Sequence, residues 1–218
     1  MNYFAHGMRF TNRPYFLAGT AVPDWLSIAD RRVRMRARRV APHADGSATP
    51  QADLAGGVMQ HLEDDRWFHQ TEAFYSISGR LTGRFQDVLG RDTGFRTGFL
   101  GHVVTELVLD GVLIDANPKL IDAYYEALDS VDPHAVEDGV NRMARDKTSN
   151  LAILIPLFQR EQFLRDYLQP ERLLFRLNQV MRRIKLNPLP EDVADVLVYA
   201  WEIVKPKTGD LLPGHLFV

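Results

Sequence analysis

The sequence contains no cysteine among its 218 residues. This absence excludes a disulfide scaffold, a thiolate zinc site and a cysteine nucleophile, so a metal site would need His, Asp or Glu ligands. No segment has the roughly 18 consecutive apolar residues expected of a membrane span, and the N-terminal segment lacks the basic start and apolar block of a secretory signal. We therefore expect a soluble, cytoplasmic protein without a transmembrane segment.

Lysine is also scarce, with 5 Lys among the 26 basic residues and 21 Arg. The formal net charge of −2 argues against bulk nucleic-acid binding, which usually appears as a strongly basic domain. Much of the positive charge is nevertheless gathered in one run, at Arg31, Arg32, Arg34, Arg36, Arg38 and Arg39. Such a run is either a solvated face or an anion site for phosphate groups or an acidic protein partner.

Apolar residues recur at three- and four-residue spacing along most of the chain, which predicts an all-α fold. We expect one compact multi-helix domain over residues 1–218, with a half at 1–115 that carries the candidate metal site and a helical half at 116–218. Arg31–Arg39 alone alternates like a strand, and the run around Val103-Val104 leaves a buried strand open as an alternative. The expected helices are 54–78, 95–114, 120–128, 134–145, 150–168, 171–185 and 191–204.

The segment from Gly57 to His69 carries the most informative polar pattern. His61, Asp65 and His69 are four residues apart, so a helix would place all three on one face. Two imidazoles and a carboxylate suit a divalent metal ion. The three positions span about 12 Å, so either two ions bind or one terminal His is not a ligand. The alternative is a solvated polar face.

A second pattern lies in an otherwise apolar helix. His102, Glu106 and Asp110 are again four residues apart. Polar side chains on an apolar helix need partners, because unpaired polar groups are costly to bury. The alternative is a core histidine with satisfied hydrogen bonds and a helix end at Asp110.

Two further candidates lie upstream in apolar segments, His6 and Asp24. A lone buried His is often structural, and an Asp after Pro is often a helix cap. Four separate segments nevertheless each offer a His or a carboxylate in an apolar setting. Together they could supply one complete set of metal ligands.

The same segments resemble the acyl carrier protein phosphodiesterase family. Met1 to His6 is similar to the opening of those chains, Gly57 to His69 to their Gly-x-x-x-His-x-x-x-Asp motif, and Gly19 to Trp25 and Gly98 to Glu106 to two further motifs. The resemblance covers roughly residues 1–115. It implies an HD-domain-like all-α hydrolase with a Mn-type ion and an activated water. The implied substrate is the phosphodiester between phosphopantetheine and a carrier protein serine.

Four positions match the family's motifs, at His6, Asp24, His61 and Asp65. His102 and Glu106 stand where the family has Asp, and the family's next His is replaced by Leu107. These exchanges keep ligand-type side chains, so the resemblance supports a metal site better than it supports the exact substrate.

A weaker similarity links the chain to the zinc-dependent phospholipase C-like proteins. Ala21 to Trp25 is similar to their Ala-Pro-Asp-like turn, and Gly98 to His102 to their Gly-x-x-x-His helix. This resemblance implies zinc and a phospholipid headgroup. Both resemblances imply a metal ion, helices and phosphoester hydrolysis.

We therefore predict a metal-dependent phosphodiesterase-like hydrolase, with Mn or Fe favoured and Zn as the alternative. We expect His69 to act as proton shuttle or second-ion ligand, and Asp110 to orient a His ligand. The phosphate group or an acidic carrier protein would bind at Arg31, Arg32 and Arg34. The predicted metal ligands are His6, Asp24, His61, Asp65, His102 and Glu106. The rival hypothesis is a non-catalytic helical protein that binds a metal or a partner.

Overall fold

The computed structural model describes residues 1–90, 94–215 and 217. Within them the chain forms twelve α-helices and four 3-10 helices, and no strand is present in these ranges. The predicted all-α class is therefore confirmed. The strand suggested by the alternation of Arg31–Arg39 is wrong, although the alternation itself is real: Val33 and Met35 are buried between exposed arginines. Arg31 and Arg32 lie in a turn, the next four residues form no regular element, and Ala37–Val40 form the short helix α3. A strand needs a partner strand, and none is present in the described part.

The chain divides into two compact units, each made of two separate stretches of sequence. The first unit contains Met1–Arg66 and Asn117–Gln162, and the second contains Trp67–Ala116 and Phe163–Val218. The boundary between Ala116 and Asn117 lies one residue from the predicted division between residues 115 and 116. The prediction of a single domain, and of an HD-like arrangement within it, stays a prediction.

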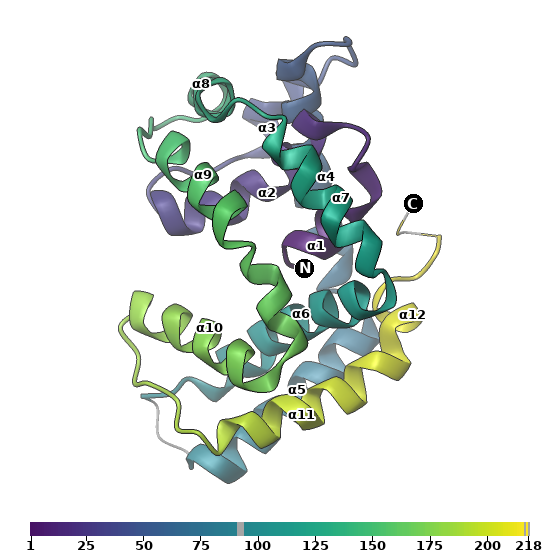
Figure 1. Cartoon of the computed structure of the whole chain (residues 1–218), viewed down its shortest axis with the longest axis vertical. Coiled ribbons are helices and arrows are strands. Elements are labelled where there is room, and N and C mark those ends of the chain that lie inside the picture. The colour runs from purple at the N-terminus through teal and green to yellow at the C-terminus, as the bar shows by residue number, and fades with distance from the viewer. Residues whose placement is uncertain (91–93, 216, 218) are drawn as a thin grey trace. The chain divides into compact units, whose positions relative to one another are not determined.

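The first unit is built around α2 (Pro14–Ala29), which packs against four other helices (Figure 1). Pro14 at its first turn suits a helix start, because a helix leaves that backbone N–H without an internal partner. Its central side chains are fully buried, and Trp25 meets Phe158 edge-on at 5.4 Å between ring centroids. The helices that surround α2 are α1 (Tyr3–Gly7), α7 (Pro118–Asp129), α8 (Pro133–Met143) and α9 (Leu151–Glu161).

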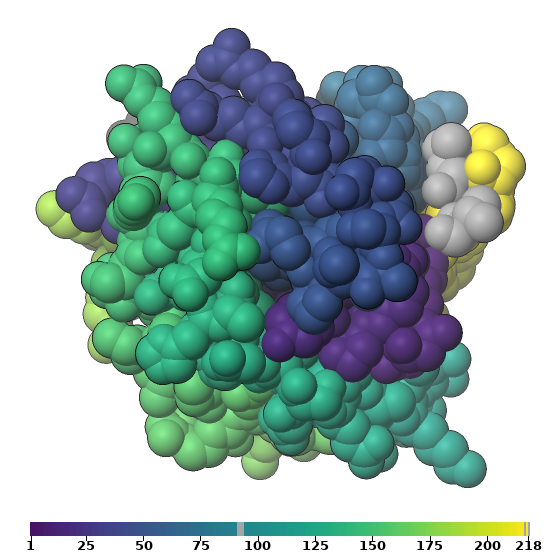
Figure 2. Space-filling model, turned by 90° about the horizontal axis from the view of Figure 1, so that it is seen from above, coloured from purple at the N-terminus to yellow at the C-terminus, as the bar shows by residue number. Residues whose placement is uncertain are grey.

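Helix α4 (Pro50–Phe68) also belongs mainly to the first unit and lies against α8. A Cβ atom on Gly139 of α8 would come within 3.0 Å of the Gln51 side chain of α4. Figure 2 shows this part of the surface, where blue residues of the α4 segment lie beside green residues of the α8 and α9 segments. The predicted helix over 54–78 is therefore two helices, since α4 ends at Phe68 and α5 (Glu72–Leu89) follows.

The break between α4 and α5 has a local cause at Thr71. Its hydroxyl oxygen accepts a hydrogen bond from the backbone N–H of Phe74 at 3.2 Å, which caps the start of α5. Capping by Thr satisfies one of the backbone donors that every helix start leaves without an internal partner. His69 consequently lies in the turn between the helices and not on α4.

The second unit is built around α6 (Thr97–Ala116), which packs against α5 and α11 (Val193–Val204). The Val103-Val104 run lies within α6, so the helix is confirmed there and the strand alternative is wrong. By length and composition α6 could cross a membrane, but 67% of its apolar window is buried, as in the core helix of a soluble protein. The remaining elements are α10 (Pro170–Arg183), α12 (Thr208–Leu211) and two 3-10 helices, Phe163–Leu168 and Lys205–Lys207.

Candidate metal centre

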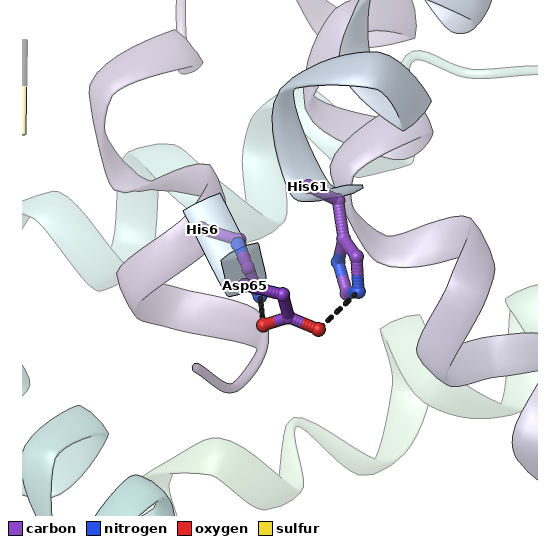
Figure 3. Close-up of side chains that lie close together, drawn as sticks. All are labelled: His6, His61 and Asp65. Carbon is purple, nitrogen blue, oxygen red and sulfur yellow. Dashed lines mark ion pairs between the residues drawn. The ribbon is translucent and has the colours of Figure 1, made fainter. Parts of the chain in front are cut away.

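His6, His61 and Asp65 come together in the first unit, from α1 and α4 (Figure 3). Nε2 of His6 lies 3.3 Å from Oδ1 of Asp65, and Nε2 of His61 lies 3.4 Å from Oδ2 of the same carboxylate. The two imidazole rings are stacked, with 4.0 Å between their centroids. One carboxylate thus faces two ring nitrogens, one with each oxygen.

The close crossing of α2 and α4 brings His61 into this position. A Cβ atom on Gly57 would lie 2.9 Å from the Cα atom of Gly19, so the two backbones touch where both residues are glycine. One turn further along α4, Nδ1 of His61 donates to the backbone carbonyl of Thr20 at 2.8 Å. Because a carbonyl oxygen only accepts, we infer that the proton of a neutral His61 ring is on Nδ1.

The ring of His6 is held in a similar way by Asp64. Nδ1 of His6 lies 3.4 Å from Oδ2 of Asp64, and that carboxylate also accepts from Arg9 at 2.6 Å and from Gln60 at 2.9 Å. Burial raises the pKa of Asp64, but the hydrogen bond with His6 and the charge of Arg9 outweigh it and keep the pKa below its ordinary value. An ionised Asp64 only accepts, so the proton of a neutral His6 ring is also on Nδ1.

These partners leave both Nε2 lone pairs directed at the carboxylate of Asp65. His6 is fully buried, and within the described residues its Nε2 has no hydrogen-bond partner. A second proton on each ring would place two positive charges on stacked rings, and like charges at such a distance repel. A cation between the nitrogens and the carboxylate resolves this conflict with both rings neutral.

The spacing of the donor atoms also suits a metal ion. Nitrogen and oxygen ligands lie about 2.0–2.1 Å from zinc, so two ligand atoms of a tetrahedral site are about 3.3–3.4 Å apart. The two distances to Asp65 match this separation. Two His and a carboxylate that binds through one oxygen would also leave a coordination position open, which is typical of catalytic metal sites.

The carboxylate of Asp65 is strongly acidic in this setting. Burial raises its pKa, but two effects together outweigh burial in the metal-free protein. They are the contacts with His6 and His61, whose rings can there carry a proton on Nε2, and the charge of the terminal ammonium of Met1 at 2.8 Å. The pKa of Asp65 is therefore well below its ordinary value. Its side chain is 35% exposed, so the carboxylate is the part of this cluster that solvent reaches.

A second cluster lies in the second unit and contains His69, His102 and Glu106. Nε2 of His69 donates to Oε1 of Glu106 at 2.8 Å, and Nε2 of His102 lies 3.3 Å from the same oxygen. The two clusters thus contain five of the six predicted metal ligands, and His69 in addition. The prediction that all of these ligands form one set stays a prediction.

Asp24 and Asp110 belong to neither cluster of the described residues. Asp24 is partly buried on α2, and Asp110 is fully buried on α6, four residues beyond Glu106. The arginines proposed to bind phosphate, Arg31, Arg32 and Arg34, are exposed, and Arg32 pairs with Asp30 at 3.0 Å. The roles assigned to these residues stay predictions.

Asp64 was not among the predicted site residues, although it holds His6 in place. A signal was present, because Asp64 lies three residues after His61 and seven after Gly57, which puts the three on one helix face. The partner Arg9 gave no comparable signal, since only the tertiary structure brings it to α4.

No family model, curated protein or solved structure matches this chain. The resemblance to acyl carrier protein phosphodiesterases therefore stands on the motifs quoted above.

Proposed function

We propose that the chain is a metal-dependent hydrolase of phosphodiesters. The observation that carries the proposal is the pair of Nε2 atoms, on His6 and His61, that face the two oxygens of Asp65 at 3.3 and 3.4 Å. The donor set and its spacing fit a divalent first-row metal with an open position. The motif resemblance favours Mn or Fe, and Zn, whose ligand spacing the site fits, is the alternative.

Residues of the first unit would have two different roles at the site, binding the ion and fixing the imidazole rings. His6, His61 and Asp65 would hold the ion, while Asp64 and the Thr20 carbonyl fix the two rings through Nδ1. Such outer partners set the tautomer and the ring orientation of metal-bound His. When bound, the ion supplies a water of lowered pKa and polarises a phosphoryl oxygen.

A phosphodiester substrate is favoured over other esters because of the motif resemblance and the exposed arginines. Arg31, Arg32 and Arg34 are all exposed in the first unit and offer planar donors that suit phosphate oxygens. The narrower proposal is the phosphopantetheine linkage of an acyl carrier protein, an acidic partner. It rests on the similarity of the N-terminal half alone.

The test is turnover by metal-stripped protein that is reloaded with Mn²⁺, Fe²⁺ or Zn²⁺. The probes are bis(4-nitrophenyl) phosphate and phosphopantetheinylated carrier protein, with released product followed by absorbance and by mass. We expect metal-dependent turnover that is lost in His61→Ala and retained in His134→Ala, because His134 is exposed at the start of α8. Equal turnover in His61→Ala, or none by any loaded form of the folded protein, would refute the proposal.

A further inference from the structure

We propose that His69, His102 and Glu106 form a second metal-ion site, built entirely from residues of the second unit. The proposal concerns ion binding and does not depend on the hydrolase activity. The second site would hold a divalent first-row ion through two imidazoles and one carboxylate. The resemblances cover only part of this trio. His102 lies in the segment similar to the second family's Gly-x-x-x-His helix, whereas His102 and Glu106 replace residues of the first family's motif.

The donor atoms of the trio converge on one point. Both Nε2 atoms approach the same oxygen of Glu106, at 2.8 Å from His69 and 3.3 Å from His102. One ligand atom from each residue lies within 4.8 Å of the others. Both nitrogens lie close to the same oxygen, so all three side chains would bind an ion near Oε1 with little rearrangement.

Two elements of the second unit hold these side chains in place. His102 and Glu106 are one helical turn apart on α6, which itself lies close to α5. A Cβ atom on Gly101 would lie 2.9 Å from the backbone nitrogen of Thr82 on α5, so Gly101 permits the close approach. The residue next to His102 is therefore fixed by helix packing.

The ring of Phe74 braces both histidines. His69 and His102 each form a T-shaped contact with it at 4.9 Å between centroids, and the two imidazoles stack at 4.8 Å. Phe74 is itself buried, and its backbone nitrogen is bonded to the cap residue Thr71. The trio is thus preorganised by an aromatic contact that the first cluster lacks among the described ring pairs.

The second site is more open than the first. The side chains of His69 and His102 are 31% and 45% exposed, whereas those of His6 and His61 are 0% and 4% exposed. A ligand exposed to water exchanges its ion more readily, because solvent competes for the open positions. We therefore expect the second site to bind its ion more weakly and to release it first on chelation.

The test is the metal content of the full chain, measured by elemental mass spectrometry after dialysis against Zn²⁺ or Co²⁺. We expect two ions per wild-type chain and one in His102→Ala. We also expect one ion in His61→Ala and two in the control His134→Ala. The ion lost in His102→Ala should be the one that a weak chelator removes first from the wild type.

Two results would overturn the proposal. One is a single ion per wild-type chain that His102→Ala does not remove. A single ion that this variant does remove would support the trio and refute the first site. The other is the loss of both ions in either variant, which would indicate one joint set of ligands. Circular dichroism and the thermal midpoint of each variant establish that the protein is folded, and Glu106→Gln provides a second variant of similar shape. Because the readout is stoichiometry, a chain with two ions and no turnover would refute only the proposed hydrolase.

Discussion

Gly57 touches Gly19 where α4 crosses α2, and a Cβ atom on Gly57 would lie 2.9 Å from the Cα atom of Gly19. This contact sets the distance between the two helix backbones. One turn later it lets His61 reach the carbonyl of Thr20 at 2.8 Å. The glycine four residues before the histidine therefore has a physical role, which is to bring a metal ligand within reach of the group that orients it.

Gly57→Ala should consequently destabilise the protein by about 1–3 kcal/mol, because an added methyl group overpacks a backbone contact. The substitution should also weaken metal binding, because it pushes α4 away from α2 and so moves His61 away from the carbonyl of Thr20. Urea unfolding and metal titration measure the two effects. Gly79→Ala is the matched control: no heavy atom lies within 4 Å of a Cβ atom there, and it should stabilise α5 by about 0.5–1 kcal/mol. Similar stability of the two variants would contradict this account of the crossing.

A second prediction concerns Asp64, which contacts the metal ligand His6. Asp64→Asn should lower the affinity of the first site about 10–100-fold, the usual cost of removing a carboxylate that orients a metal-bound His. The measurement is competition with a chelator of known affinity. Glu63→Gln serves as the control on the same helix, because Glu63 is 52% exposed and pairs with Arg66 at the surface. Unchanged affinity in Asp64→Asn would show that His6 needs no such support.

Helical spacing was sufficient to predict the pairs within one helix. His61 with Asp65 and His102 with Glu106 are four residues apart, and each pair lies in one of the two clusters. Spacing wrongly placed His69 on the helix of His61, because a new helix starts after the cap at Thr71. The Thr71-Glu72 pair is a recognisable helix start in the sequence.

Contacts between segments were harder to predict than contacts within a helix. His6 was expected at the site from the convergence of polar residues in apolar segments and from a motif resemblance. Its neighbour Arg9 was missed, because its ion pair with Asp64 spans 55 residues of sequence. Only the tertiary structure brings the 3-10 helix Met8–Phe10, which carries Arg9, to α4, and a single sequence carries no periodic signal for such a contact.

The third prediction is acid sensitivity of the metal-free protein. The pKa values of Asp64 and Asp65 are lowered on folding, so the unfolded chain binds protons more readily at these groups. Their contribution to stability is present above the ordinary Asp pKa of about 3.9 and is lost as the pH falls through the folded pKa values. The thermal midpoint should therefore fall steadily below about pH 5. Asp64→Asn should flatten this dependence, whereas an equal slope in that variant would assign the acid sensitivity to other groups.

Metal removal provides the fourth prediction. An ion that binds only the folded chain stabilises it by about 2.7 kcal/mol at a free concentration 100 times its dissociation constant. Chelation should lower the thermal midpoint of the wild type, and reloading should restore it. The variant His61→Ala should respond less to the chelator, because it has lost the more buried of the two sites. An unchanged midpoint after metal loss has been verified would contradict this prediction, since it would mean that the ion adds nothing to the folded state.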